Sequence, residues 1–243
     1  NQTGQDICVL NYENEYTRDF GGRCPARVVY FSSARPLENG YFLRGDKIVR
    51  AEAGKEEELL DIRRDMNLVG ICNVENVMAA IAIAEGMGVD FETIKRVIGQ
   101  FHAVEHRIEY VAETKGVVYY NDSKGTNPDA AIKAVEAMVR PTIVIGGGYD
   151  KESVYDEWIA SFGTKVKSLV LLGQTADKIA EAAAKAGFTA VTKVDSLEEA
   201  VAECARQAQD GDAVLLSPAC ASWGMFKNFE ERGDLFKEYV KKL

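Results

Sequence analysis

Several features are scarce in this sequence, and each scarcity excludes a class of protein. The five cysteines are scattered, with no Cys-x-x-Cys pair, which argues against a disulfide framework or a zinc site and indicates reduced thiols in the cytoplasm. No run of about 18 apolar residues occurs, so we expect neither a transmembrane helix nor a membrane partner. The N-terminal residues form no basic or apolar region, so we expect no secretory signal there.

Positive charge and histidine are also in short supply. The formal net charge of -9 argues against general binding to nucleic acid, although a few local cations are enough to hold a nucleotide. Only two histidines are present, His102 and His106, so we do not expect a catalytic Cys–His pair. The remaining composition, 47% hydrophobic and 28% charged, is typical of a soluble globular chain with one large or two ordinary domains.

The first hundred residues mix short strands with helices. Patterns of apolar residues predict two strands, one hairpin, one segment that fits either a strand or a short helix, and two helices. In chain order these lie at residues 7–11, 27–31, 40–49, 56–61, 73–87 and 91–99. The pattern changes near residues 100–105, so we divide the chain into domains 1–104 and 105–243.

The second domain begins with a predicted hairpin, after which strands and helices alternate. Continuous apolar strands such as residues 142–145 and 169–172 indicate a parallel sheet that is covered on both faces. Residues 105–243 are therefore predicted to be α/β, doubly wound and Rossmann-like. The predicted hairpin strands lie at 108–112 and 117–120, the further strands at 141–146, 166–172, 189–194 and 212–217, and the helices at 128–138, 152–162, 174–186, 196–209 and 229–242.

The stretch from Val117 to Ala130 carries the strongest functional pattern. Four apolar or aromatic residues predict a buried strand, and a polar turn follows it. Pro128 after Asn127 predicts a helix start with Asn127 as its N-cap. A strand that ends in such a turn is where α/β sheets bind anions, and Lys124 adds a positive charge. The alternative is an ordinary capped connection.

Two further segments end predicted strands. Gly146-Gly147-Gly148 allows either a close approach to a ligand or simply a tight turn. Lys151 follows it at a predicted helix start, where a cation is unfavourable unless an anion binds. Small residues at 217–222 leave room at the carboxyl edge of the sheet. Phe229 could contact a ligand there, or it could join Phe226 and Phe236 in the core.

Other polar residues lie near the domain boundary and at an earlier helix start. Arg107, beside His106, is placed to contact a phosphate, or alternatively to form a surface ion pair with Glu105 or Glu109. Asn73 and Asn76 begin a predicted helix, so one of them is a candidate for its cap.

Four segments resemble the Mur ligase family, in the family's order along the chain. They are N-D-S-K-G-T-N-P-D-A at residues 121–130, G-I-C-N-V-E-N at 70–76, G-G-G-Y-D-K at 146–151 and S-P-A-C-A-S at 217–222, the last continuing to Gly233. The resemblance runs from about Cys8 to the C-terminus and is nearest to the D-glutamate-adding members. It implies part of a central ATP-binding domain at residues 1–104 and a complete Rossmann-like glutamate-binding domain at 105–243.

The resemblance implies roles for the matching side chains. Lys124 matches a catalytic lysine near the reacting phosphate. Positions that contact the nucleotide are matched by Asn73, Asn76, His106, Arg107 and Asp122, and positions around D-glutamate by Thr126, Lys151, Ser222, Trp223 and Phe229. ATP and Mg²⁺ are the implied cofactors, with no metal ligand expected in this chain. D-Glutamate and UDP-N-acetylmuramoyl-L-alanine are the implied substrates of a monomeric enzyme.

The chain also departs from the family pattern. It has no phosphate-binding G-x-x-x-x-G-K-[ST] loop, so we expect ATP and Mg²⁺ to be held mainly by a half that this sequence lacks. We accordingly expect the chain alone to be inactive. Cys72 stands where the family usually has histidine, and Gly224 where it usually has aspartate.

The implied activity is ATP-dependent amide formation through an acyl phosphate. It belongs to the synthesis of peptidoglycan precursors for the cell wall, and so to cell shape and division. Two alternatives remain: a non-catalytic module that binds an amino acid or nucleotide, and a related ligase of the folylpolyglutamate type with another amine substrate. Residues 217–233 favour the D-glutamate branch.

Overall fold

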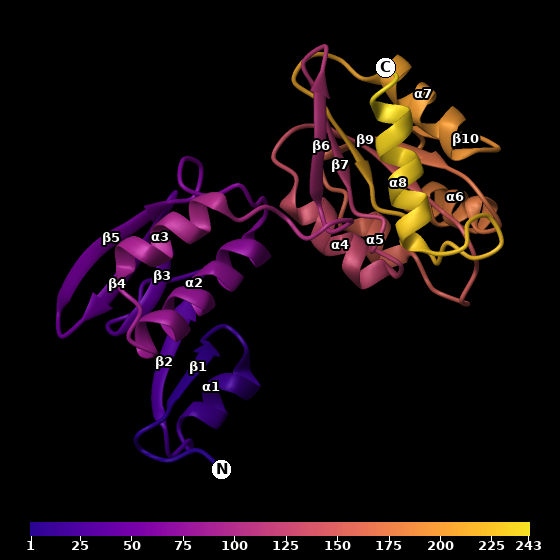
Figure 1. The fold of residues 1–243 in the computed structure, drawn as a ribbon. Helices are drawn as coiled ribbons and strands as arrows, with labels where there is room; N and C mark the ends of the chain where they lie inside the picture. Colours follow the sequence, from indigo (N-terminus) through magenta and orange to yellow (C-terminus); the bar gives the residue numbers. More distant parts are fainter. The chain divides into compact units, whose positions relative to one another are not determined.

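The structure is a computed structural model that describes all 243 residues. It divides into two compact units, Asn1–His102 and Ala103–Leu243, whereas the sequence pattern placed the division after residue 104. Figure 1 shows unit 1 in indigo to magenta and unit 2 in magenta to yellow. No helix in either unit combines the length and apolarity needed to cross a membrane.

Unit 1 is a five-stranded sheet in chain order. The first three strands run parallel, and the last three are antiparallel neighbours joined by tight turns. The segment that fitted a strand or a helix is a strand at one of the two edges of the sheet. The strands are β1 (Ile7–Asn11), β2 (Arg27–Ser32), β3 (Gly40–Arg44), β4 (Lys47–Glu52) and β5 (Lys55–Asp61).

Helices α2 (Ile71–Gly86) and α3 (Phe91–Gln100) supply the helical side of the unit 1 core. Met78 and Ile81 of α2 are fully buried against Ile48 and Leu60 of the sheet. This packing explains why the apolar spacing in α2 predicted a helix, since one face of it is removed from water.

A third helix in unit 1, α1 (Glu15–Gly21), was not predicted. Asn14 is its N-cap, and its side-chain oxygen accepts hydrogen bonds from the backbone of Tyr16 at 3.0 Å and of Thr17 at 3.2 Å. None of the helix residues is buried, so no apolar periodicity marks it in the sequence. The cap was the available signal.

Unit 2 is a six-stranded sheet in the order β10-β9-β8-β11-β7-β6. All neighbours are parallel except β6 and β7, which form the predicted hairpin at one edge. The strands are β6 (Glu109–Thr114), β7 (Val117–Asn121), β8 (Thr142–Gly146), β9 (Val166–Leu171), β10 (Val191–Lys193) and β11 (Ala213–Leu216), and the helices are α4 (Pro128–Ala137), α5 (Asp156–Ala160), α6 (Ala176–Lys185), α7 (Leu197–Gln207) and α8 (Phe229–Val240).

The central strands β7, β8 and β11 of unit 2 are covered on both faces, which confirms the doubly wound prediction. Alternate residues such as Tyr119, Ile143 and Val214 form one core with Val201 of α7 and Phe236 of α8. Helices α4, α5 and α6 cover the opposite face, where α5 contacts both α4 and α6. Burial on both faces is the reason these strands are apolar without interruption.

Candidate functional site

Three loops of unit 2 leave neighbouring strands at the same edge of the sheet. Leu216 of β11 pairs with Asn121 of β7 and with Ile145 of β8, so all three strands end at one level. The loops that follow them span residues 122–127, 147–155 and 217–228. Ligands of α/β sheets bind at this edge, and most of the predicted site residues lie on these loops.

Backbone hydrogen bonds join the three loops. The amide of Asp122 donates to the carbonyl of Leu216 at 2.7 Å, and that of Gly147 donates to Pro218 at 2.9 Å. Tyr149 donates to Ala221 at 2.9 Å, within an isolated antiparallel bridge. The edge is therefore held by main-chain contacts and does not depend on a bound ligand for its shape.

The glycines after β8 serve this joining of loops. Gly147 and Gly148 have φ values of 101° and 149°, which side chains rarely allow. A Cβ atom at Gly147 would collide with the carbonyl oxygen of Leu172, and one at Gly148 with that of Ala221. Of the two readings of this segment, the structure thus gives direct support to the tight turn.

Asp122 lies beneath the edge. Its side chain accepts hydrogen bonds from the Ser217 hydroxyl at 2.7 Å and the Ile108 amide at 3.3 Å. Burial raises the pKa of the Asp122 carboxyl to about 7, against the lowering effect of these two donors. Only 6% of the residue is exposed, so its contact with a nucleotide stays a prediction.

Lys124 stands over an aromatic ring. Its Nζ atom lies 3.8 Å from the centroid of the Phe229 ring, and no carboxylate pairs with it. Phe229 begins α8, and its carbonyl accepts a hydrogen bond from the Ser123 hydroxyl at 2.7 Å. Of the three phenylalanines considered for the core, Phe236 is fully buried there, whereas Phe229 is half-buried and faces Lys124.

Lys151 is not at a helix start, contrary to the prediction. Helix α5 begins only at Asp156, so Lys151 lies exposed in the loop and the argument from the helix dipole does not apply. Its Nζ atom lies 5.2 Å from the centroid of the Trp223 ring, and it has no carboxylate partner. The second predicted cation is therefore also available to an anion.

The remaining residues predicted around D-glutamate also follow strands of this edge. Thr126 is half-buried, and its amide donates to the Lys124 carbonyl at 2.8 Å. Ser222 is 4% exposed, and its carbonyl accepts from the Phe226 amide at 3.0 Å. Gly224, where the family usually has aspartate, has a φ of 82°, a conformation that favours glycine.

Sequence reasoning missed Arg232, which ties the loops together from below. Its guanidinium donates to the hydroxyl of Ser123 at 3.0 Å, to the carbonyl of Ser123 at 2.8 Å and to the carbonyl of Cys220 at 3.1 Å. The residue is 2% exposed, and burial lowers its pKa to about 10. The available signal was its spacing: Arg232 precedes the buried Phe236 by one helical turn.

His106 and Arg107 occupy different environments. His106 is buried, with Nδ1 3.0 Å from the Asn121 side-chain nitrogen and its ring edge-on to Phe229. Arg107 is exposed and forms no ion pair, so the alternative of a surface salt bridge is not found. Glu105 and Glu109 pair instead with Lys237.

Carboxylates gather around His106, but a cation already neutralises them. Glu105, His106 and Asp234 lie close enough together to suggest metal ligands. The Lys237 ammonium pairs with Glu105 and lies 3.1 Å from Asp234. Its positive charge disfavours a metal ion at the same place.

Asn73 and Asn76 lie in the first turns of α2 in unit 1. The N-cap is Gly70, without a side-chain hydrogen bond, so neither asparagine is the cap. The side-chain amide of Asn73 donates to the Val69 carbonyl at 2.8 Å, while Asn76 is exposed. Their contact with a nucleotide stays a prediction.

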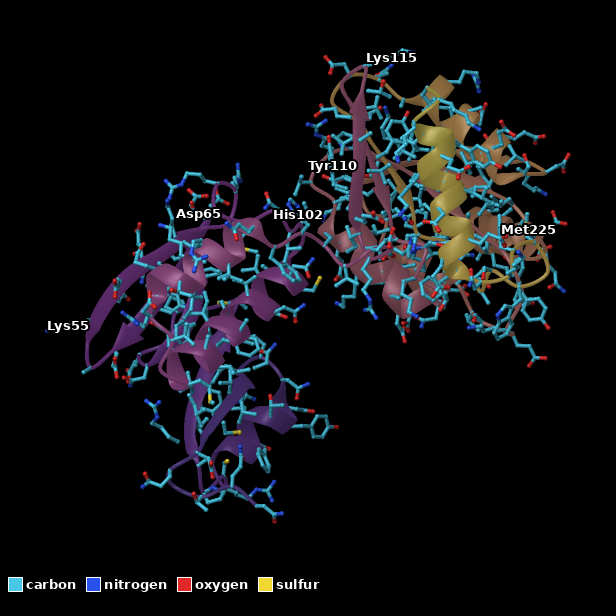
Figure 2. All side chains as sticks on the ribbon, viewed as in Figure 1. Lys55, Asp65, His102, Tyr110, Lys115 and Met225 are labelled. Carbon is cyan, nitrogen blue, oxygen red and sulfur yellow. The ribbon has the colours of Figure 1, made fainter.

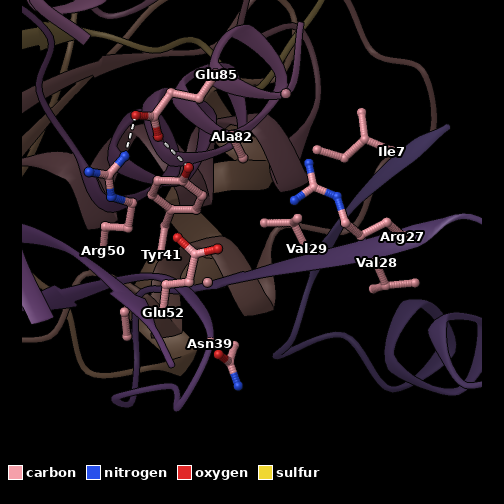
Figure 3. A pocket seen from close by; sticks show the side chains of 13 residues that line it. Ile7, Arg27, Val28, Val29, Asn39, Tyr41, Arg50, Glu52, Ala82 and Glu85 are labelled. Carbon is pink, nitrogen blue, oxygen red and sulfur yellow. Dashed lines mark hydrogen bonds and ion pairs between the residues drawn. The ribbon is translucent and has the colours of Figure 1, made fainter. Parts of the chain in front are cut away.

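A hollow of about 260 Å³ in unit 1 lies away from these asparagines. Figure 3 shows Tyr41 and Arg50 directed at Glu85 of α2, beside Ile7 and Arg27 at the starts of β1 and β2. Because α/β ligands bind at the carboxyl ends of strands, this hollow is at the wrong end for the predicted nucleotide.

Comparison with known proteins agrees with this geometry. Residues 106–220 match the family described as Mur ligase, glutamate ligase domain. Over 243 residues the chain is 54% identical to the UDP-N-acetylmuramoylalanine–D-glutamate ligase of Lachnoclostridium phytofermentans and 45% identical to that of Clostridioides difficile. Along its whole length, the chain resembles part of a Mur ligase. All of it is covered, but it spans about half the length of these relatives, 53% of each.

Solved Mur ligases share the fold at low sequence identity. The UDP-N-acetylmuramate-alanine ligase MurC of Thermotoga maritima aligns with a TM-score of 0.66 at 15% identity, covering 98% of this chain and 52% of that one. The MurF ligase of Thermotoga maritima in complex with ADP gives a TM-score of 0.62 at 16% identity, covering 98% and 55%. These likenesses confirm the Mur ligase architecture.

Proposed function

We propose that this chain is part of an ATP-dependent ligase that adds D-glutamate to UDP-N-acetylmuramoyl-L-alanine in peptidoglycan precursor synthesis. One observation carries the proposal: Lys124 and Lys151 stand at the carboxyl edge of one sheet without a carboxylate partner. The chain has 38 acidic and 29 basic residues, so carboxylates are available to pair with most lysines. Two lysines without a carboxylate partner at the ligand-binding edge therefore suggest an anionic ligand. They suit the carboxylates and phosphate of this reaction.

D-Glutamate would bind through its two carboxylates. Lys151 offers a charge-assisted hydrogen bond from the loop after β8, and Thr126 and Ser222 offer hydroxyl groups from the loops after β7 and β11. Binding at this edge would direct the amine towards the reacting carbonyl.

Lys124 would act at the bond-forming step. ATP supplies the phosphoryl group that activates the carboxylate of UDP-N-acetylmuramoyl-L-alanine as an acyl phosphate. The amine of D-glutamate then attacks the carbonyl carbon, the amide bond forms and inorganic phosphate leaves. The ammonium of Lys124 would neutralise charge on the departing phosphate, and its position over Phe229 keeps it near the edge.

The residues of this chain fit only part of the cofactor set. Unpaired lysines fit a phosphate edge, whereas the phosphate-binding loop is absent from the sequence. The acids near His106 do not fit Mg²⁺, because Lys237 pairs with them. We therefore assign no metal-dependent step to these residues and propose that a further portion of the enzyme holds ATP and Mg²⁺.

The assay is phosphate release and D-glutamate incorporation with ATP, Mg²⁺ and UDP-N-acetylmuramoyl-L-alanine. We expect no turnover from the 243-residue chain and turnover when the preceding half of the Lachnoclostridium relative is fused to Asn1. In that fusion Lys124→Ala should abolish turnover, while Lys133→Ala, at an exposed lysine of α4, should not. Full activity of the Lys124→Ala fusion would contradict the proposal.

We further propose that the enzyme works as a cytoplasmic monomer. Its product would feed cell-wall assembly, and so cell shape and division. Identity to named D-glutamate ligases along the whole chain favours this reading over a non-catalytic module or a folylpolyglutamate-type ligase.

A further inference from the structure

Trp223 occupies an unusual place for a large aromatic residue. It is 54% exposed, whereas Trp158, the other tryptophan of the chain, is fully buried. The Lys151 ammonium lies 5.2 Å from the centroid of this ring and has no carboxylate partner. An exposed ring and an unpaired cation thus meet at the ligand edge, from two different loops.

The loop that carries Trp223 is fixed on both sides of the ring. On one side, the antiparallel bridge between Tyr149 and Ala221 joins it to the loop after β8. On the other, the Phe226 amide donates to the Ser222 carbonyl at 3.0 Å. Tyr149 also packs against the Trp223 ring, with the centroids 5.5 Å apart and the planes at 61°.

Met225 adds a further anchor to this loop. The Met225 side chain packs against Gly173, which follows Leu172 after β9. A Cβ atom added to Gly173 would lie only 2.8 Å from the Met225 sulfur. Figure 2 labels Met225 on the loop in unit 2. With these contacts, the loop around the indole is held in place, and the Lys151 ammonium lies over the ring.

We propose that Trp223 is a positioning residue that holds the Lys151 ammonium in place for a carboxylate of D-glutamate. The inference rests on the proposed function. An aromatic face attracts an ammonium without neutralising its charge. A carboxylate in the same place would form an ion pair that an incoming anion must displace. The indole therefore restricts a flexible side chain while leaving its charge available to the ligand.

The effect on affinity follows from the size of such contacts. Cation–π contacts at exposed sites correspond to a change in dissociation constant of about two- to fivefold. We expect Trp223→Leu to raise the dissociation constant for D-glutamate by that factor. Trp223→Phe should keep most of the wild-type affinity, because phenylalanine keeps an aromatic face. Rescue by phenylalanine separates the cation–π contact from loss of apolar packing.

The chain contains a matched control. Lys242 lies 5.3 Å from the Tyr239 ring centroid at the end of α8, nearly the same geometry at a place with no predicted ligand. Tyr239→Leu should leave D-glutamate affinity unchanged. An effect equal to that of Trp223→Leu would show a general loss of stability and overturn the inference.

The experiment is a titration of the 243-residue chain with D-glutamate, followed by amide and lysine side-chain chemical shifts, with L-glutamate as the reference ligand. Absence of a stereoselective response in the wild type would contradict the proposed function and the inference with it. A wild-type response that Lys151→Ala abolishes but Trp223→Leu leaves unchanged would overturn the inference alone. A weakened response in Trp223→Leu, with the Lys151 side-chain signals shifted as the ring is lost, would support it.

Discussion

The two units differ in how their strands end. In unit 2, β7, β8 and β11 are parallel neighbours, and the loop after each one carries a predicted site residue. In unit 1, β3, β4 and β5 alternate in direction, so their ends are divided between two edges. Parallel pairing therefore concentrates the polar side chains of unit 2, while unit 1 offers Asn73 and Asn76 from the start of a helix.

The units also differ in how their sheets are buried. Every residue of β8 and β11 is buried, whereas four of the five residues of β1 are only partly buried. β1 pairs with β2 alone, and its outer edge has no partner strand within the chain. The site loops of unit 2 therefore follow central, buried strands, although each sheet also has partly exposed edge strands, such as β1 in unit 1 and β10 in unit 2.

The largest expected effect is on the buried guanidinium beneath the edge of unit 2. Arg232→Met removes three hydrogen bonds and leaves buried oxygens of Ser123 and Cys220 without a donor. We expect the free energy of unfolding of unit 2 to fall by about 3–5 kcal/mol. Both tryptophans lie in unit 2, so tryptophan fluorescence during urea unfolding reports on that unit alone.

Arg206→Met is the control for this change. Arg206 is exposed on α7 and pairs with Glu203, and an exposed ion pair contributes less than about 1 kcal/mol. Equal losses in the two variants, or a matching loss of amide protection in unit 1, would break the distinction drawn between the units.

The buried carboxyl of Asp122 should make unit 2 the more pH-sensitive unit. Its pKa is raised to about 7 in the folded state, from an ordinary value near 3.9 in the unfolded chain. The folded state thus binds the proton more tightly than the unfolded chain does. The stability contributed by protonated Asp122 is therefore lost as pH rises from about 4 through 7. The slope is up to about 1.4 kcal/mol for each pH unit.

Asp122→Asn is expected to remove that slope from the unfolding free energy of unit 2. The measurement is urea unfolding at several pH values between about 4 and 8, read by tryptophan fluorescence. A variant that kept the wild-type slope would show that another group titrates.

Two Gly→Ala substitutions compare how tightly the backbone is packed in the two units. Gly148→Ala places a Cβ atom against the Ala221 carbonyl in unit 2, and we expect a loss of about 2–3 kcal/mol. In Gly54→Ala, in the β4–β5 turn of unit 1, the added Cβ atom has no neighbour within 4 Å. We expect a loss of about 1 kcal/mol in the free energy of unfolding, mainly because alanine disfavours the φ of 78°. Amide hydrogen exchange of each unit measures both, and equal losses would argue against close packing of the loops after β8 and β11.

The smallest effect concerns the surface of unit 1. Asn14→Ala removes the acceptor for the Tyr16 and Thr17 amides at the start of α1. We expect a loss of about 1 kcal/mol, confined to this helix because none of its residues is buried. Faster amide exchange in α1 with unchanged exchange in α2 would confirm it. Faster amide exchange throughout unit 1 would instead show that α1 stabilises the core of that unit.

Much of the fold was predictable because it follows from local patterns. The central strands β8 and β11 of unit 2 are almost entirely apolar, the hairpin of β3 and β4 turns at Gly45-Asp46, and Asn127 with Pro128 begins α4 as expected. Each of these depends on residues a few positions apart. The one missed helix, α1, is exposed and has no apolar face, and α5 proved much shorter than the predicted 152–162.

The sequence by itself determined which side chains reach the edge of the unit 2 sheet, because parallel strands end together and their loops follow them. Only the tertiary structure decided how those side chains pair. Lys124 meets Phe229, Lys151 meets Trp223, and Arg232 binds Ser123 from 109 positions away. No local periodicity records such contacts, since they arise when strand order brings distant loops together and, for Arg232, when burial favours a partner for each polar group.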